Sequence, residues 1–78
     1  MDMKNIQEII KRATERYQLP DGELQVYIQT TEPKVYSILG DEILEADNNY
    51  LYIVDNIKKE YIMINHNIIK KIIITDRK

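Results

Sequence analysis

Two short polar segments carry the side chains of this chain that are best suited to binding chemistry. The first is Asp47-Asn48-Asn49, which is followed directly by Tyr50. The second is Asn65-His66-Asn67, which contains the only histidine. Amide and imidazole groups can hydrogen bond the edges of nucleobases, and histidine or tyrosine rings can stack on their faces. Both segments are also good turn sequences, so a purely structural role is the simpler alternative.

Catalytic and metal-binding chemistry finds little support. The chain has no cysteine and one histidine, which argues against a zinc site. The only serine, Ser37, lacks a Gly-x-Ser-x-Gly setting, and two glycines are too few for a phosphate-binding loop. The carboxylates of Glu42, Glu45 and Asp47 could act as an acid and a base, but such a cluster is more often a solvated strand edge. We therefore expect a protein that is not an enzyme and that uses no cofactor or metal.

A helix is expected before both polar segments. Apolar residues at helical spacing predict a helix over about residues 5–18, and the residues that form its stripe are Ile6, Ile9, Ile10, Ala13 and Tyr17. Asn5 and Glu8 fit a capping box at its start. The segment Leu19-Pro20-Asp21-Gly22 is typical of a helix end followed by a turn. The stripe needs a partner surface, and we expect it to be the open end of a small sheet.

The apolar period then changes from the helical value to two, which predicts strands. The predicted strands cover residues 24–29, 35–39, 50–55, 60–64 and 68–75. Gly40-Asp41-Glu42 is either a tight turn or a bulge in one long bent strand that resumes at Ile43. One helix followed by about five short strands predicts a mainly β fold, a small, strongly bent five-stranded antiparallel barrel. The chain is expected to be one domain over residues 1–78, with the barrel over about 23–75.

Length and composition limit the class of protein further. A chain of 78 residues forms at most one domain and buries only about 60% of its unfolded surface, so assembly is a natural way to add stability. No segment approaches the about 18 to 20 apolar residues that span a bilayer, and the N-terminus lacks the apolar part of a signal peptide. We expect a soluble, cytoplasmic protein with no membrane partner.

Charge is distributed unevenly along the chain, although the net charge is only −2. Residues 21–55 carry one lysine and eight carboxylates, whereas residues 56–78 carry six basic and two acidic side chains. A net negative charge argues mildly against strong nucleic-acid binding. The distribution is compatible with a mixed solvated surface, with acidic and basic faces that meet between subunits, or with a local anion site near the C-terminus.

The segment from Ile64 to Asp76 resembles the second signature of the Sm-like (LSm) RNA-binding family, Ile-Arg-Gly-x-x-Ile-Arg-Tyr-Ile-Ile-Leu-Pro-Asp. Seven residues match in identity or type without a gap: Ile64, Ile69, Lys70, Ile72, Ile73, Ile74 and Asp76. The polar corner departs from the signature, because Asn65 replaces the arginine and His66 the glycine. The bacterial Hfq branch carries Tyr-Lys-His-Ala at this corner, and His66 corresponds to its histidine.

The first signature of the same family resembles Gly40, Asp47, Tyr50 and the apolar residues 51–54. Two departures stand out: Gly40 lies seven residues before Asp47, one more than the usual spacing, and Leu51 stands where the family has an asparagine. The resemblance implies an Sm-like barrel and a ring of identical subunits, about five to seven in number. It also implies that both loops bind single-stranded RNA without catalysis, through Asp47, Asn48, Asn49, Tyr50, Asn65, His66 and Asn67, with Lys70 helping in place of the arginine.

Two other functions stay open at this point. The same barrel could serve as an assembly or structural ring that binds no RNA, which the acidic middle segment and the missing arginine favour. Alternatively, the chain could be a small regulatory module that docks on a protein partner through its N-terminal helix.

Overall fold

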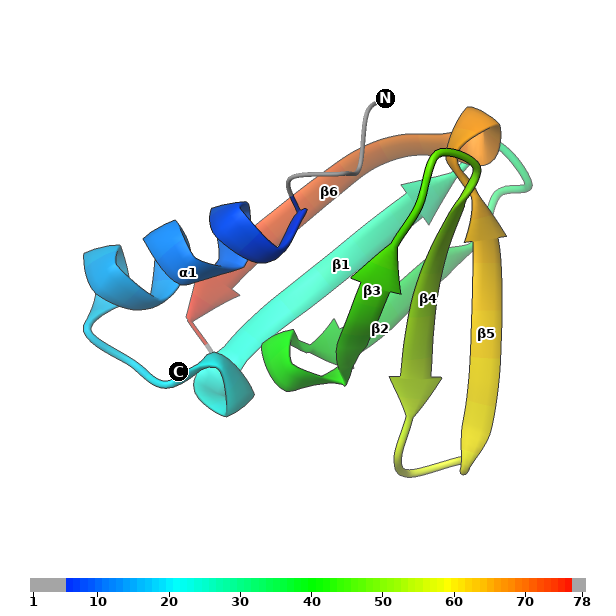
Figure 1. Ribbon diagram of the computed structural model, residues 1–78. Coiled ribbons are helices and arrows are strands. Elements are labelled where there is room, and N and C mark those ends of the chain that lie inside the picture. Colours follow the sequence, from blue (N-terminus) through cyan, green and yellow to red (C-terminus); the bar gives the residue numbers. More distant parts are fainter. Residues whose placement is uncertain (1–5, 77–78) are drawn as a thin grey trace.

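A computed structural model describes residues 6–76 as one helix followed by six strands (Figure 1). The helix and strands are α1 (Ile6–Tyr17), β1 (Leu24–Thr30), β2 (Val35–Leu39), β3 (Ile43–Ala46), β4 (Tyr50–Asp55), β5 (Glu60–Asn65) and β6 (Ile69–Asp76). Three single-turn 3₁₀ helices connect them: η1 (Asp21–Glu23), η2 (Gly40–Glu42) and η3 (His66–Ile68). None of these helices is long and apolar enough to cross a membrane.

The strands form two three-stranded antiparallel sheets, with the orders β2-β1-β6 and β3-β4-β5. The prediction of a mainly β fold with one N-terminal helix is therefore confirmed. The prediction of a closed barrel of five strands is not, because residues 6–76 contain six strands in two separate sheets. The sixth strand arises where the turn η2 divides the expected long strand into β2 and β3, so a tight turn, one of the two alternatives at Gly40, is what forms.

Two contacts explain why the chain turns at η2. A Cβ atom on Gly40 would lie 2.5 Å from the backbone oxygen of Asp21, so η1 and η2 approach more closely than any side chain would allow. The buried carboxylate of Glu42 accepts hydrogen bonds from the backbone N–H of Leu39 at 2.7 Å and of Asn56 at 2.8 Å. Glu42 therefore joins the end of β2 to the turn between β4 and β5.

Replacing Gly40 with alanine is expected to destabilise the protein, by about 1–3 kcal/mol, because the added methyl group meets backbone that must shift. Gly22→Ala is the matched control, since a Cβ there would meet the movable carboxylate of Asp41, at 3.0 Å. Urea unfolding of both variants checks the expectation. Equal stabilities would show that the packing of η1 on η2 does not constrain the fold.

The core lies between the two sheets and follows the period of two seen in the sequence. In β1 the side chains of Leu24, Val26 and Ile28 point inward and are fully buried. They belong to the same hydrophobic cluster as Leu51 and Ile53, which occupy the inward positions of β4. This isoleucine-rich layer holds the two sheets together by burial of apolar surface, the main favourable contribution to folding.

The helix α1 lies across one end of this core and contacts β3, β6 and η1 (Figure 1). Ile6 and Ile10 are buried in the core, with 1% and 3% of their surface exposed. Ile9 is 45% exposed and Tyr17 37%, so the buried face is narrower than the predicted stripe.

The sequence predicted a cap at the start of α1 and a turn after its end. The expected cap at Asn5 lies outside the described residues. Glu8 accepts a hydrogen bond from Arg12 at 3.0 Å on the helix surface. At the other end, Gln18 takes a left-handed conformation with φ of 55°, and the N–H of Leu19 bonds the carbonyl of Thr14 at 3.1 Å. The helix thus ends just before the proline and glycine that predicted its end.

Candidate functional site

The two polar segments found in the sequence lie together at one end of the β3-β4-β5 sheet. Asp47-Asn48-Asn49 forms the turn between β3 and β4, and Asn65-His66-Asn67 leads from β5 into η3. The backbone N–H of His66 donates to the carbonyl of Asn49 at 2.9 Å, and Tyr50 pairs with Asn65 across the two strands. Figure 1 shows this loop end at the top, where the green turn meets the orange η3.

Asp47 holds the first turn in shape. Its carboxylate accepts hydrogen bonds from the backbone N–H groups of Asn49 at 2.8 Å and Tyr50 at 2.7 Å, and from the hydroxyl of Tyr52 at 2.8 Å. The two backbone donors, followed by the Tyr52 hydroxyl, lower the pKa of Asp47 below its ordinary value of 3.8. The same hydrogen bond to Asp47 raises the pKa of Tyr52 above its ordinary value of 10.0. The carboxylate is therefore engaged within the chain.

These two pKa shifts predict how stability depends on pH. The shift at Asp47 stabilises the folded state fully above pH 3.8, and this contribution is lost as the pH falls through the lowered pKa. The shift at Tyr52 stabilises the folded state below pH 10.0 and is lost as the pH rises through the raised pKa. Urea unfolding across the pH range, with Asp47→Asn and Tyr52→Phe, isolates each contribution.

In this pH series, the acid loss of stability should be smaller in Asp47→Asn than in the parent. The alkaline loss should be smaller in Tyr52→Phe. Parallel stability curves for the parent and both variants would show that the Asp47–Tyr52 contact does not hold the turn.

The second polar segment, Asn65-His66-Asn67, also forms a hydrogen bond within itself. The side-chain oxygen of Asn65 accepts the backbone N–H of Asn67 at 2.8 Å, which caps η3. His66 is only 7% exposed, and its Nε2 has no hydrogen-bond partner among the described residues. The resemblance implied that Asn65 and His66 face a bound base. In the structure Asn65 is half-buried, and His66, the first residue of η3, is buried.

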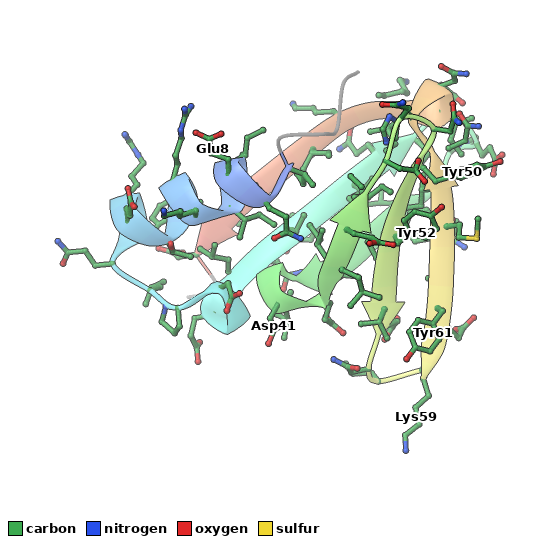
Figure 2. The ribbon with its side chains drawn as sticks, viewed as in Figure 1. Glu8, Asp41, Tyr50, Tyr52, Lys59 and Tyr61 are labelled. Atoms are coloured by element: carbon green, nitrogen blue, oxygen red, sulfur yellow. The ribbon has the colours of Figure 1, made fainter. Side chains whose placement is uncertain are left out.

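The other predicted site residues are open to solvent or nearly so. Asn48, Asn49 and Asn67 are exposed at the tips of the two turns. Tyr50 is half-buried, and its ring centroid lies 6.3 Å from that of Tyr52, with the rings tilted by 45° (Figure 2). Lys70 is exposed as well.

Lys70 owes its position to an irregularity in the pairing of β6 with β1. Ile69 pairs with Thr30 and Lys71 pairs with Gln29, so Lys70 is the extra residue of a β-bulge. A bulge redirects a side chain and interrupts the ladder locally. The bulge follows η3 directly, which places the lysine backbone close to the loop end.

The sequence predicted the turn at Asp47 but not the contact from Tyr52 or the bulge at Lys70. The Asp47 turn has a local signal, since an aspartate that bonds N–H groups two and three residues ahead is a common turn device. The contact from Tyr52 has only a weak signal, namely that Tyr50 and Tyr52 share one face of β4. The bulge at Lys70 has none, because it depends on the register between strands far apart in the sequence.

The loop end therefore offers accessible amides, one nearby lysine and one partly covered tyrosine ring. Such groups can bind by hydrogen bonding, charge and stacking. Among residues 6–76, no group of three His, Cys, Asp or Glu side chains could hold a metal ion. No protein-family model matches the chain, and comparisons with curated proteins and with solved structures found no match.

Proposed function

We propose that the protein is a non-catalytic module that assembles with copies of itself and binds single-stranded RNA at the loop end, as the Sm-like resemblance suggests. One observation carries the proposal. The two polar turns, sixteen residues or more apart in sequence, are joined by the hydrogen bond from His66 to Asn49 at 2.9 Å. Polar side chains from both turns are therefore available to one ligand.

The proposed contacts differ from those that the resemblance alone would give. Asn48, Asn49 and Asn67 would hydrogen bond base edges, since their side chains are exposed. Lys70 would attract a phosphate group, as lysine does in most nucleic-acid complexes. Asp47 and His66 would act indirectly, by fixing the turns that carry these amides.

Assembly is supported first by the free outer edge of β5. The N–H of His66 donates to Asn49, so the backbone groups of His66 point toward β4. Backbone groups alternate in direction along an antiparallel strand, so those of every second residue of β5 also point toward β4. The backbone groups of Tyr61, Met63 and Asn65 then point to the outer edge, where no strand of the described chain pairs with them. Unpaired edges of this kind favour pairing with another chain.

The outer edge of β6 likewise pairs with no strand among residues 6–76. Thr30 donates its N–H to the carbonyl of Lys34, on the β2 side of β1. Backbone groups alternate in direction along a strand, so those of Tyr27 face β6. Its partner Ile73 therefore faces β1, and the backbone groups of Ile72 and Ile74 face outward. Pairing of β5 in one copy with β6 in the next is a head-to-tail contact that forms a ring when the rotation between copies closes. The Sm-like resemblance suggests about five to seven subunits.

A second candidate function is assembly without RNA. It is favoured by the engagement of Asp47 within its own turn and by the burial of His66. The excess of carboxylates between residues 21 and 55 points the same way, since it repels a polyanion. The two candidates share the ring and differ only in whether the loop end takes a ligand.

Titration of fluorescently labelled U-rich and A-rich hexanucleotides at low and moderate salt separates the candidates. We expect Asn67→Ala to weaken binding of the preferred sequence about fivefold, the scale of one lost hydrogen bond. Lys70→Ala should weaken all sequences alike and reduce the salt slope by about one. Lys59→Ala, at the opposite end of the sheet (Figure 2), is the control and should bind like the parent.

Absence of binding at low salt, from protein shown to be assembled, would remove the RNA function and leave the assembly function. Equal losses in Lys70→Ala and Lys59→Ala would show nonspecific attraction and contradict a site at the loop end.

A further inference from the structure

A groove runs along the outer edge of β2, away from the loop end. It consists of two adjoining cavities of about 380 and 310 Å³, which share Ser37, Ile38, Asp55 and Lys58 in their walls. All five residues of β2 line it. The opposite wall comes from the turn between β4 and β5 and from the start of β5.

The backbone of β2 presents unpaired groups to this groove. Lys34 accepts the N–H of Thr30 at 3.0 Å, so Lys34 faces β1 and the following residues alternate. The N–H and C=O groups of Val35 and Ser37 therefore face the groove. The N–H of Leu39, the next residue on that side, leaves the ladder and donates to Glu42. Two residues of β2 thus offer the hydrogen-bonding pattern that an added strand needs.

The side chains around these groups are partly apolar. Tyr36 and Ile62 are half-buried, one on each wall, and leave apolar surface toward the groove. Val35 is 54% exposed, and Ile57, on the turn between β4 and β5, is 94% exposed. Lys34 covers one end, with its Nζ 4.6 Å from the centroid of the Tyr36 ring. An extended segment with an apolar residue at every second position would cover this surface.

The charged side chains of the groove determine which extended segments can bind there. The groove is lined by two lysines and four carboxylates: Lys34, Lys58, Asp41, Glu42, Asp55 and Glu60. The carboxylates of Glu42 and Asp55 already accept backbone hydrogen bonds. Asp41 and Glu60 are exposed and accept no hydrogen bond within the described chain, so they remain available to a cation. Because its four carboxylates outnumber its two lysines, the groove carries a formal net charge of −2, and the occupant should therefore be basic.

We propose that this groove binds an extended basic segment of a partner protein, which pairs with β2 as an added strand. Its lysine or arginine side chains lie against Asp41 and Glu60, and its alternate apolar residues cover Tyr36 and Ile62. Backbone hydrogen bonds to Val35 and Ser37 supply affinity, and the side chains supply selectivity. The basic strand β6 of the same chain cannot be the occupant, because it is paired with β1. The site is independent of the proposed RNA-binding loop end.

The test is an NMR titration of isotope-labelled protein with acetylated peptides of about eight residues, the length of an ordinary strand. One peptide alternates lysine with valine, and the other alternates glutamate with valine. We expect the amide signals of Val35 and Ser37 to shift with the lysine peptide. The glutamate peptide should bind about tenfold more weakly. Shifts confined to the loop end, or equal binding of both peptides, would overturn the proposal.

Two further measurements sharpen the test. The double variant Asp41→Lys and Glu60→Lys should reverse the preference, whereas Asn67→Ala should leave peptide binding unchanged and weaken only RNA binding. N-methylation of alternate peptide nitrogens should abolish binding in one register and preserve it in the other, because only alternate residues of an added strand bond β2. Equal effects of methylation in both registers would contradict strand addition. If the mass of the protein in solution grows with its concentration and the peptide suppresses this growth, the occupant is a second copy of the chain. That result would contradict a separate partner.

Discussion

Truncation of Ile10 to alanine should lower the free energy of unfolding by about 2–4 kcal/mol, whereas the same truncation of Ile9 should cost less than about 0.5 kcal/mol. Ile10 is 3% exposed and packs in the core between the sheets, and its neighbour in sequence is 45% exposed. The two variants lose the same atoms from the same helix, so helix propensity does not distinguish them. Urea unfolding at neutral pH measures both.

The outcome also bears on the role of the helix. A large cost at Ile10 alone would show that α1 completes the core of its own chain. Similar small costs at Ile9 and Ile10 would contradict the packing described above. They would favour the alternative in which the helix docks on a protein partner.

The second large effect is expected at the outer edge of β6. Ile74→Pro removes a backbone N–H that faces away from β1, so the ladder within the chain should survive while pairing with a neighbour is lost. The variant should be monomeric under conditions in which the parent is assembled. Ile74→Ala is the control, because it loses the side chain and keeps the N–H.

Light scattering reports the masses, and circular dichroism reports whether the strands persist. A proline variant with the same mass as the parent would show that β6 is not the assembling edge. Dissociation of Ile74→Ala as well would assign the effect to packing of the side chain.

Much of the fold was predictable because the sequence carries strong local signals. The strand Tyr50–Asp55 was predicted with both ends correct, since turn residues flank an apolar run on each side. The C-terminal end of the helix was predicted to within one residue. The division of the second predicted strand into β2 and β3 was left open. It depends on the approach of Gly40 to Asp21, a contact that no local pattern reveals.

The candidate site, too, was predictable only in part from the sequence. That the turn at Asp47 and the corner at His66 lie together follows from pairing of β4 with β5, which their flanking strands made predictable. The burial of the histidine was not predictable, because no local pattern marks the 3₁₀ turn that starts there. The resemblance placed Asp47 among the RNA-binding residues, but it did not reveal the hydrogen bonds that its carboxylate accepts from the backbone N–H groups of Asn49 and Tyr50 and from the Tyr52 hydroxyl.

The mass of the protein in solution, measured by native mass spectrometry with and without a U-rich or A-rich hexanucleotide, tests the central claim most directly. The account predicts an assembly of about five to seven subunits that gains mass when the preferred oligonucleotide is added. An assembly that gains no mass would limit the function to assembly alone. A monomer in both samples would contradict the ring, and with it the proposal that repeated weak sites bind RNA.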